Sequence, residues 1–353
     1  MVSIEDVAHR AGVSVATVSR ALRGLPNVAT DTRLRVEAAA RDLDYVSSPS
    51  AARLAAGRTG TLGLVLPGLG TWFGGRFMAY VHEVWSDAGF DPLLIVVDDH
   101  SDRDRFLRDL PFRKRVDGLL LLDIPFGDDE YERLAGTGVG VVTAGPRSAV
   151  VPSVGIDDRS AARSIVEHLV ELGHRDIALL DGSINQPFDY TGPNERKIGV
   201  LEALDAAGLD LPDERRAETD WTPGDATVAM ERILDRCDEP PTAVVCFSDE
   251  IAVGAISVLR QRGYSVPRDV SVTGFDDHDL ARHLGLTTVH QPVATVAARA
   301  ADRLVQLVAT GESEVRHEVL PTRLVVREST APPRDRAPVA RAAASVGEPG
   351  GAS

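Results

Sequence analysis

Apolar residues in the first 22 positions repeat with the period of two short helices. Those of the first pattern share one face at the i, i+3, i+4 and i+7 spacing; they are Ile4, Val7, Ala8 and Ala11. Gly12 ends this helix, and Ser14 is suited to cap a second helix in which Val18 and Leu22 point inward. The spacing therefore predicts two helices joined by a tight turn, which is the outline of a helix-turn-helix.

A third helix is predicted after a turn that contains Gly24, Pro26 and Asn27. Its buried stripe consists of Val36, Ala39, Ala40 and Leu43. Thr30 is suited to cap this helix at its start. The first 46 residues are thus expected to form a small all-α domain, which we call the head.

Beyond residue 60 the pattern changes to short apolar runs that alternate with longer helical stretches. The runs are 61–67, 91–97, 118–123, 139–142, 176–182, 242–247 and 269–276. The clearest helical stretches between them are 159–172, 194–207, 225–236 and 249–262. Runs of four to eight apolar residues are typical of strands buried on both faces, and helices between them imply parallel crossovers. We predict an α/β core of two doubly wound parallel sheets, with a ligand beyond the carboxyl ends of the strands.

The formal charge of −15 appears unsuited to a protein that binds nucleic acid. Residues 1–58, however, carry eight Arg against six acidic residues, so all of the negative excess lies in the rest of the chain. Affinity for phosphate is therefore expected only at the head. Two cysteines, no signal-peptide pattern and no long apolar stretch predict a cytoplasmic protein, associated with the nucleoid if it binds DNA, and no membrane partner.

The second predicted helix has the outward-facing side chains that a DNA reader needs. One helix fits the major groove, where its N-terminal side chains reach base edges. Arg20 can donate two hydrogen bonds to a guanine, and Val15 and Ala16 offer apolar contact to thymine methyl groups. Phosphate contacts suit Ser14, Thr17, Ser19 and, on the third helix, Arg33. Two helices of an ordinary bundle would have the same periodicity, and a plain surface charge is the alternative for Arg33.

The motifs DVAHRAGVSVATVSRAL, VATDTRLRVEAAARDLDY and AARLAAGRTGTLGLVLP resemble the head of a LacI/GalR-family transcriptional repressor. The resemblance implies a hinge helix and linker over 47–58 that orders on operator DNA, with Leu54 inserted into the minor groove. The sequence departs from the family at Ser47, where relatives commonly have Pro, and it carries Pro49 instead. An Ala-rich linker without DNA contact is the alternative.

The resemblance continues to about residue 330, through GIDDRSAARSIVEHLVELGHRDIALLDG, NERKIGVLEAL, FSDEIAVGAISVLRQRGYSVPRDVSVTGFDD, LTTVHQP and LPTRLVVREST. It implies a periplasmic-binding-protein-like core over 59–330. The N-subdomain would comprise about 61–160 and 290–319, and the C-subdomain about 161–289 and 320–330. Residues 331–353 are rich in Pro, Ala and Gly without periodicity, and we expect a disordered tail.

Candidate effector contacts follow predicted strands. By motif match, the resemblance implies Arg196, Trp221 and Asp276. The loops after other strands add Trp72, Phe73, Asp123, Asp157, Asp158 and Asp249. A helix cap is the alternative for Asp249 and for Asp157, and a packed core position is the alternative for Trp72 and Phe73. Phe188 and Tyr190 stand in a loop that has no clear family counterpart.

These observations predict a homodimeric repressor that binds palindromic double-stranded operator DNA and is controlled by a small-molecule effector. Carboxylates, an arginine and a flat aromatic favour a carbohydrate effector. A purine- or other metabolite-responsive corepressor system is one alternative, and a solute-binding module without regulation is another. No nucleophile elbow, glycine-rich phosphate loop or metal-ligand cluster appears at the required spacing, so we expect no enzyme activity, no cofactor and no metal.

Overall fold

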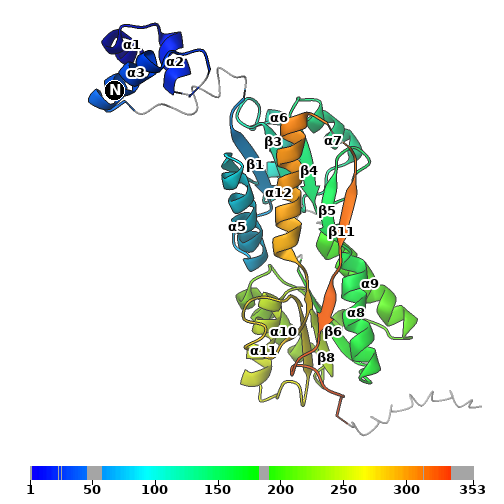
Figure 1. Cartoon of the computed structure of the whole chain (residues 1–353). Helices are drawn as coiled ribbons and strands as arrows, with labels where there is room; N and C mark the ends of the chain where they lie inside the picture. The colour runs from blue at the N-terminus through cyan, green and yellow to red at the C-terminus, as the bar shows by residue number, and fades with distance from the viewer. Residues whose placement is uncertain are drawn as a thin grey trace, which may run out of the picture.

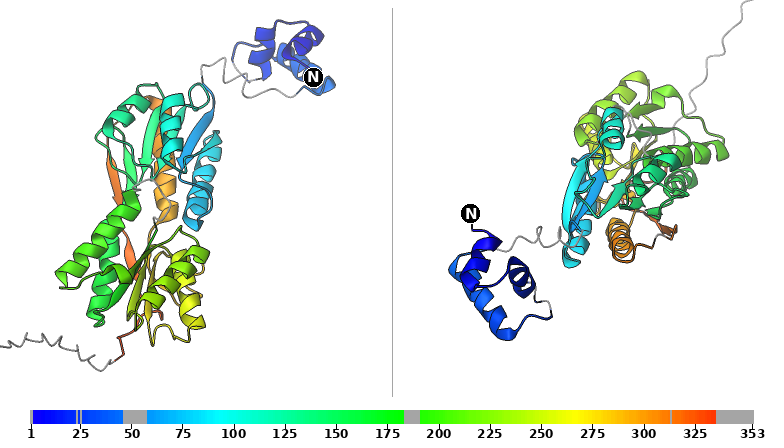
Figure 2. Two further views of the ribbon diagram at one scale, coloured as in Figure 1. Left: turned by 180° about the vertical axis from the view of Figure 1, so that it is seen from behind. Right: turned by 90° about the horizontal axis from the view of Figure 1, so that it is seen from above.

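The computed structural model describes residues 2–22, 24, 26–45, 58–182, 191–312 and 314–334. Within these ranges the chain forms a small helical domain and two α/β lobes, as the apolar pattern predicts (Figures 1 and 2). Among the described residues, none of the helices combines the length and the hydropathy that a bilayer span requires.

The helical domain consists of α1 (Ile4–Ala11), α2 (Val15–Leu22) and α3 (Thr30–Asp42). Ser3 and Asp6 form a capping box at the start of α1, and Gly12 adopts φ +67° at its end, where a residue without Cβ is unstrained. A small apolar core joins the three helices; its fully buried members include Val7, Val18 and Val36. The predicted helix-turn-helix is therefore present.

Two details of the head differ from the prediction. Ala21 is buried although the apolar pattern did not mark it, whereas Leu22 is half-buried and packs against the core, as predicted. Thr30 is the first residue of α3 and does not cap it; Ala29 occupies the cap position, with no side-chain hydrogen bond to the helix.

The first α/β unit, which we call the N-lobe, is built on six parallel strands in the order β11-β5-β4-β3-β1-β2. Their bounds are β1 Thr61–Leu66, β2 Asp91–Val96, β3 Gly118–Leu122, β4 Gly140–Ala144, β5 Ser153–Ile156 and β11 His317–Leu320. Helices α5 (Trp72–Asp87) and α12 (Val293–Thr310) pack together on one face, and α6 (His100–Asp109) and α7 (Asp128–Ala135) cover the other (Figure 1). Strands β1, β3 and β4 are buried on both sides, which explains their nearly continuous apolar sequence.

The second unit, the C-lobe, has the strand order β12-β10-β9-β8-β6-β7, in which only β12 runs antiparallel to its neighbour. Its strands are β6 Ile177–Asp181, β7 Arg216–Glu218, β8 Ala243–Cys246, β9 Ser271–Asp276, β10 Thr287–His290 and β12 Arg323–Val325. Its helices form two pairs, α8 (Asp158–Glu171) with α9 (Thr191–Ala206) and α10 (Pro223–Arg236) with α11 (Asp249–Gln261); a 3-10 turn, η1, spans Asp213–Arg215.

The chain passes between the lobes three times. The passages lie between β5 and α8, between β10 and α12, and between β11 and β12. As a result, α12 and β11 belong to the N-lobe although they follow most of the C-lobe in sequence (Figure 1). The carboxyl ends of strands from both sheets meet at these passages.

Candidate functional site

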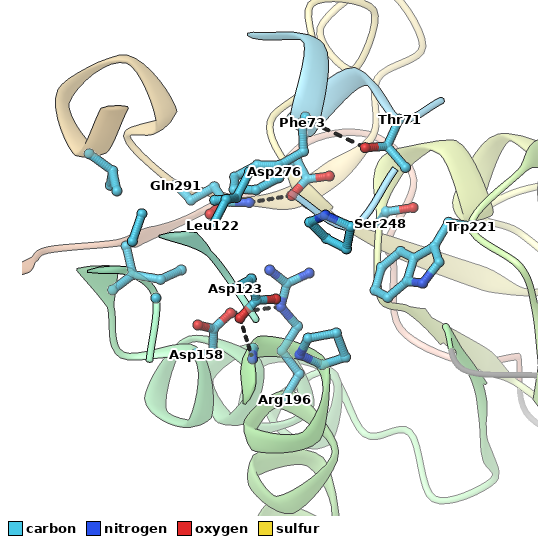
Figure 3. A pocket seen from close by; sticks show the side chains of 18 of the residues that line it. Thr71, Phe73, Leu122, Asp123, Asp158, Arg196, Trp221, Ser248, Asp276 and Gln291 are labelled. Atoms are coloured by element: carbon cyan, nitrogen blue, oxygen red, sulfur yellow. Dashed lines mark hydrogen bonds and ion pairs between the residues drawn. The ribbon is translucent and has the colours of Figure 1, made fainter. Parts of the chain in front are cut away.

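A cavity of about 130 Å³ lies where the two lobes face each other. On this measure a water needs about 10–15 Å³, so the cavity has room for on the order of ten water-sized groups. Its N-lobe residues are Pro67, Gly68, Thr71, Phe73, Gly74, Leu122, Asp123, Ala144, Gly145, Gly155, Ile156 and Val296. Its C-lobe residues and those of the passages are Asp158, Gly192, Pro193, Arg196, Trp221, Ser248, Glu250, Asp276 and Gln291 (Figure 3).

Arg196 projects into this cavity from the second turn of α9. Its Nε donates to Asp158 Oδ1 at 2.8 Å, and one terminal nitrogen donates to the Phe247 carbonyl at 2.8 Å. The guanidinium also lies 3.7 Å above the ring of Phe275. Three different elements therefore orient a side chain that is only 8% exposed, so Arg196 is preorganised toward the cavity.

Asp123 directly follows β3, and its side chain links the two lobes. Its Oδ1 accepts a hydrogen bond from the Gly192 backbone N–H at 3.1 Å, at the start of α9. Burial raises the pKa of Asp123 to about 7, and the charge of Asp158 adds to this rise; the Gly192 N–H and Arg196 act against it. Near neutral pH this carboxyl group can therefore both donate and accept hydrogen bonds.

Asp276 stands at the carboxyl end of β9, where it is 6% exposed. It accepts a hydrogen bond from the Gln291 side-chain amide, which lies on the passage from β10 to α12 (Figure 3). Burial raises the pKa of Asp276 to about 7, against the opposing effects of Arg196 and the Gln291 bond. A titratable acid thus contacts a segment that connects the two lobes.

Trp221 supplies the flat aromatic surface of the cavity. A Cβ built on Gly182 would lie 2.4 Å from its indole, so the ring packs directly against the backbone there. Asp123, Trp221 and Asp276 all have positive φ, at +50°, +61° and +116°. Such backbone conformations cost about 1–3 kcal/mol each and concentrate at binding sites. Their presence at three cavity residues supports a functional role for this place in the fold.

Phe73 lines the cavity, but its neighbour Trp72 does not. Because consecutive helical residues point about 100° apart, the first turn of α5 sends the two rings in different directions. Trp72 instead contacts the C-lobe: its backbone N–H donates to Glu250 Oε2 at 3.2 Å, and its ring lies 4.9 Å from that of His278. The structure places Trp72 at the contact between the lobes, beside the cavity.

Asp249 also lies outside the cavity lining. Ser248, and not Asp249, caps α11, by accepting from the Ile251 N–H. Asp249 is 2% exposed and accepts from the His278 N–H and the Thr288 hydroxyl, both at 2.6 Å. Burial and the charge of Asp276 raise its pKa well above the ordinary value. These bonds give Asp249 a packing role within the C-lobe.

Ser248, Glu250 and Gln291 also line the cavity and were not singled out from the sequence. Each lies within two residues of a strand end or a proposed cap. Because ligands of such sheets bind beyond the carboxyl ends of the strands, these positions could have been predicted to line the site. Asp157 caps α8 through the Ser160 N–H at 2.9 Å, as its alternative reading predicted. Asp158, the next residue, faces Arg196.

On the head, the predicted DNA-contact side chains at 14–17, 19 and 20 are exposed or half-buried. The Ser14 hydroxyl accepts from the Thr17 N–H at 3.2 Å and bonds the Thr17 hydroxyl, so Ser14 acts as the predicted cap of α2. Arg33 donates to the Ala21 carbonyl at 3.3 Å, at the end of α2. That bond gives Arg33 a part in holding α2 against α3. Leu54, Phe188 and Tyr190 lie outside the described residues.

In the described ranges, no three His, Cys, Asp or Glu side chains gather as metal ligands would. Cys246 is buried within β8, and burial raises the pKa of its thiol far above the ordinary range.

Comparisons with known proteins bear on both the head and the lobes. Residues 3–48 match the family model described as bacterial regulatory proteins, lacI family, and residues 166–330 match that of a periplasmic binding protein-like domain. Catabolite control protein A of Priestia megaterium is 31% identical over 333 residues, which cover 93% of this chain and 99% of the relative. The chain belongs to the lacI family of bacterial regulatory proteins.

Other members of the lacI family show the same extent of similarity. The HTH-type transcriptional repressor PurR of Actinobacillus pleuropneumoniae serotype 3 is 31% identical, over 93% of this chain and 98% of its own. Among solved structures, a complex of the transcriptional regulator CelR with cellobiose is 32% identical, with a TM-score of 0.67 over 93% of this chain and all of the other. The lac repressor dimer bound to operator and the anti-inducer ONPF is 27% identical, with a TM-score of 0.81 over 94% and 99% of the two chains.

This lacI-family protein is accordingly a DNA-binding transcriptional repressor with an effector-binding domain, and its relatives are regulators and not enzymes. The head carries the DNA-binding motif, and the lobes form the effector-binding part.

Proposed function

We propose that this repressor is controlled by a sugar bound in the cavity between the lobes. The observation that carries the proposal is the combination of Arg196, Asp123, Asp276 and Gln291 with the indole of Trp221 in one small cavity. Carboxylates, guanidinium and amide groups bond hydroxyls, and an aromatic ring covers the apolar face of a sugar. The relative solved with cellobiose supports the same class of effector.

A purine or another planar metabolite is the second candidate. Phe73 and Trp221 both line the cavity and offer two aromatic surfaces to a flat ring. The similarity to PurR repressors points in the same direction. An effector of this kind would act as a corepressor and strengthen DNA binding, whereas the proposed sugar would weaken it.

The proposed mechanism is a shift between two arrangements of the lobes. Arg196 and Trp221 belong to the C-lobe and Phe73 and Leu122 to the N-lobe, so a ligand that contacts all of them favours one arrangement. If operator DNA favours the other, effector and DNA weaken each other by the same factor. The cavity is built from both sides, as this coupling requires.

We further propose a homodimer that binds a palindromic operator through Ser14, Val15, Ala16, Thr17, Ser19 and Arg20, with Leu54 in the linker as an additional contact. Strand β2 supports the dimer: it is the edge of its sheet, and Pro92 and Leu94 on it are exposed. An uncovered apolar edge strand is a liability that a second copy would remove. The lac repressor in the similar structure is a dimer on operator.

We propose the domain limits that the sequence predicts: a head over 1–46, a linker over 47–58, the core over 59–330 and a tail over 331–353. We likewise propose a cytoplasmic protein acting at the nucleoid, since operator DNA is its partner.

The direct test is an operator-binding assay on the full chain with a panel of mono- and disaccharides and nucleobases. A sugar that releases the DNA supports the proposal, and a nucleobase that strengthens binding would replace it with the second candidate. Asp276→Ala should abolish the response while leaving operator binding intact. Asp210→Ala, which removes an exposed carboxylate from the C-lobe, is the control and should leave the response unchanged. Loss of operator binding in Asp276→Ala would show a structural role instead.

A further inference from the structure

Acidic residues outnumber basic residues in the cavity lining. Among the residues that the structure describes, the cavity's ionisable lining side chains are the four acids Asp123, Asp158, Glu250 and Asp276 and the single base Arg196. In sequence, residues 183–190 add no Lys, Arg or His. An anionic ligand would therefore meet one cation among several carboxyl groups.

Arg196 is already engaged by this chain. It pairs with Asp158 at 2.8 Å, and both side chains are nearly inaccessible, at 10% and 14% exposed. A second donor is bonded to the Phe247 carbonyl. A ligand phosphate would have to compete with Asp158 for the one guanidinium that the cavity offers.

Helix N-termini are the other places where proteins bind anions, because their backbone N–H groups are free and the helix dipole favours negative charge. Side chains of the chain itself bond the starts of α5, α8, α9 and α11 at this cavity, whereas the start of α12, next to Gln291, has no side-chain cap. Asp123 accepts from the Gly192 N–H of α9, and Glu250 accepts from the Trp72 N–H of α5. Asp157 caps α8, and Ser248 caps α11.

Building on the function proposed above, we propose that the cavity selects an uncharged, hydroxyl-bearing ligand and excludes phosphorylated or carboxylated forms of it. Asp123 and Glu250 set this selection, because each places a carboxyl group at a helix N-terminus, where its negative charge offsets the positive potential that would attract a ligand anion. The apolar side chains of Phe73, Leu122 and Val296 also line the cavity and can pack against the C–H groups of such a ligand.

The raised pKa values of two cavity acids are compatible with a neutral ligand. With pKa values of about 7, Asp123 and Asp276 can take up protons when the cavity is filled, which avoids leaving unpaired charges beside a neutral molecule. A ligand amine would instead hold both acids ionised.

The first experiment compares matched sugars on the full chain by calorimetry: glucose with glucose 6-phosphate, glucuronate and glucosamine, and the same series for galactose. We expect the neutral member of a series to bind at least about 100-fold more tightly than its anionic forms, since like-charge contacts disfavour the latter. Equal or tighter binding of a phosphate or carboxylate form, or binding of the amine alone, overturns the proposal.

The second experiment needs no knowledge of the sugar. Inorganic phosphate is titrated against the wild-type chain and against the double variant Asp123→Asn, Glu250→Gln, at constant ionic strength, with thermal stability as the readout. Each new amide side chain keeps an oxygen that can accept the backbone hydrogen bond, from Gly192 at position 123 and from Trp72 at position 250. Operator binding shows whether the variant is folded. We expect saturable stabilisation of the double variant only, and its loss when Arg196→Met is added.

Each result of this titration decides something. Saturable phosphate binding by the wild-type chain that Arg196→Met removes overturns the charge selection. A folded double variant that still ignores phosphate overturns the roles of Asp123 and Glu250. The two proposals can also fail separately. If the cavity rejects anions but no neutral sugar affects operator binding, the proposed regulation by a sugar is wrong. If a sugar phosphate releases the operator, regulation by a sugar stands and the selection for an uncharged ligand is wrong.

Discussion

Trp72 Nε1 donates a hydrogen bond to Asp279 Oδ2 at 3.1 Å, although the two residues are 207 positions apart and belong to different lobes. The same tryptophan bonds Glu250 through its backbone and lies against the ring of His278. The start of α5 is therefore attached to the C-lobe at three points. Any motion that separates the lobes on this side has to break them.

The Trp72–Asp279 bond can be measured by a double-mutant cycle. We expect Trp72→Phe and Asp279→Ala to lower the free energy of unfolding by less together than the sum of their separate effects. The difference should be about 0.5–1.5 kcal/mol, the net value of one hydrogen bond. Urea unfolding of the four proteins provides the measurement, and strictly additive effects would show that the bond contributes nothing to stability.

Cavity acids should make the protein less stable as the pH rises. The pKa of Asp123 lies at about 7 in the folded chain against an ordinary 3.8, so the folded state holds this proton more tightly. Its contribution to stability is therefore complete below about pH 4 and is lost as the pH rises toward about 7. Asp123→Asn should flatten that part of the curve of unfolding free energy against pH.

Asp157→Asn is the matched control for this pH experiment. The bond from the Ser160 N–H lowers the pKa of Asp157, so its contribution is present at neutral pH and is lost only in acid. Asn also caps helices well. In Asp157→Asn, the slope of the unfolding free energy against pH between about pH 4 and 7 should stay as in the wild-type chain. An equal flattening in Asp157→Asn and Asp123→Asn would contradict the role given to Asp123.

Gly182→Ala should weaken effector binding through Trp221. The new Cβ would lie 2.4 Å from the indole, which therefore has to move. We expect the affinity for the effector to fall at least about tenfold, corresponding to about 1.4 kcal/mol, while operator binding without effector is kept. Gly75→Ala has open space around its Cβ and should leave the effector affinity unchanged.

Arg20→Ala tests how the head reads DNA. Arg20 is exposed on α2, and a guanine contact should be worth about 1–3 kcal/mol. The variant should lose preference at one base pair of each half-site in a binding-site selection experiment. Arg35→Ala removes the same charge from α3, and we expect it to weaken all sequences alike or not at all. A uniform loss in Arg20→Ala would place its contact on phosphate.

The sequence predicted the fold well because the apolar runs are long and unbroken. Strands such as β3 and β8 are fully buried, so no polar position interrupts their pattern. Arg196 and Asp276 could be named because a motif fixes them relative to strand and helix ends. Both were found in the cavity.

Neighbouring residues at helix starts were harder to separate. Trp72 and Phe73, or Ser248, Asp249 and Glu250, share one loop in sequence, but the rotation of the helix decides which side chain enters the cavity. That rotation depends on packing between elements far apart in the chain. Glu250 is an example, since it acts on the start of α5 in the other lobe.

The interleaved path of the chain has a consequence for fragments of this protein. The stretch 166–330, which matches one family model, contains α12 and β11 but none of the strands that they cover or pair with in the N-lobe. Leu304 and Val308 of α12 pack closely over Gly118 in β3 and would be left in water. A protease cut or a gene truncation that separates these pieces therefore exposes the apolar face of α12, and neither piece contains a complete N-lobe.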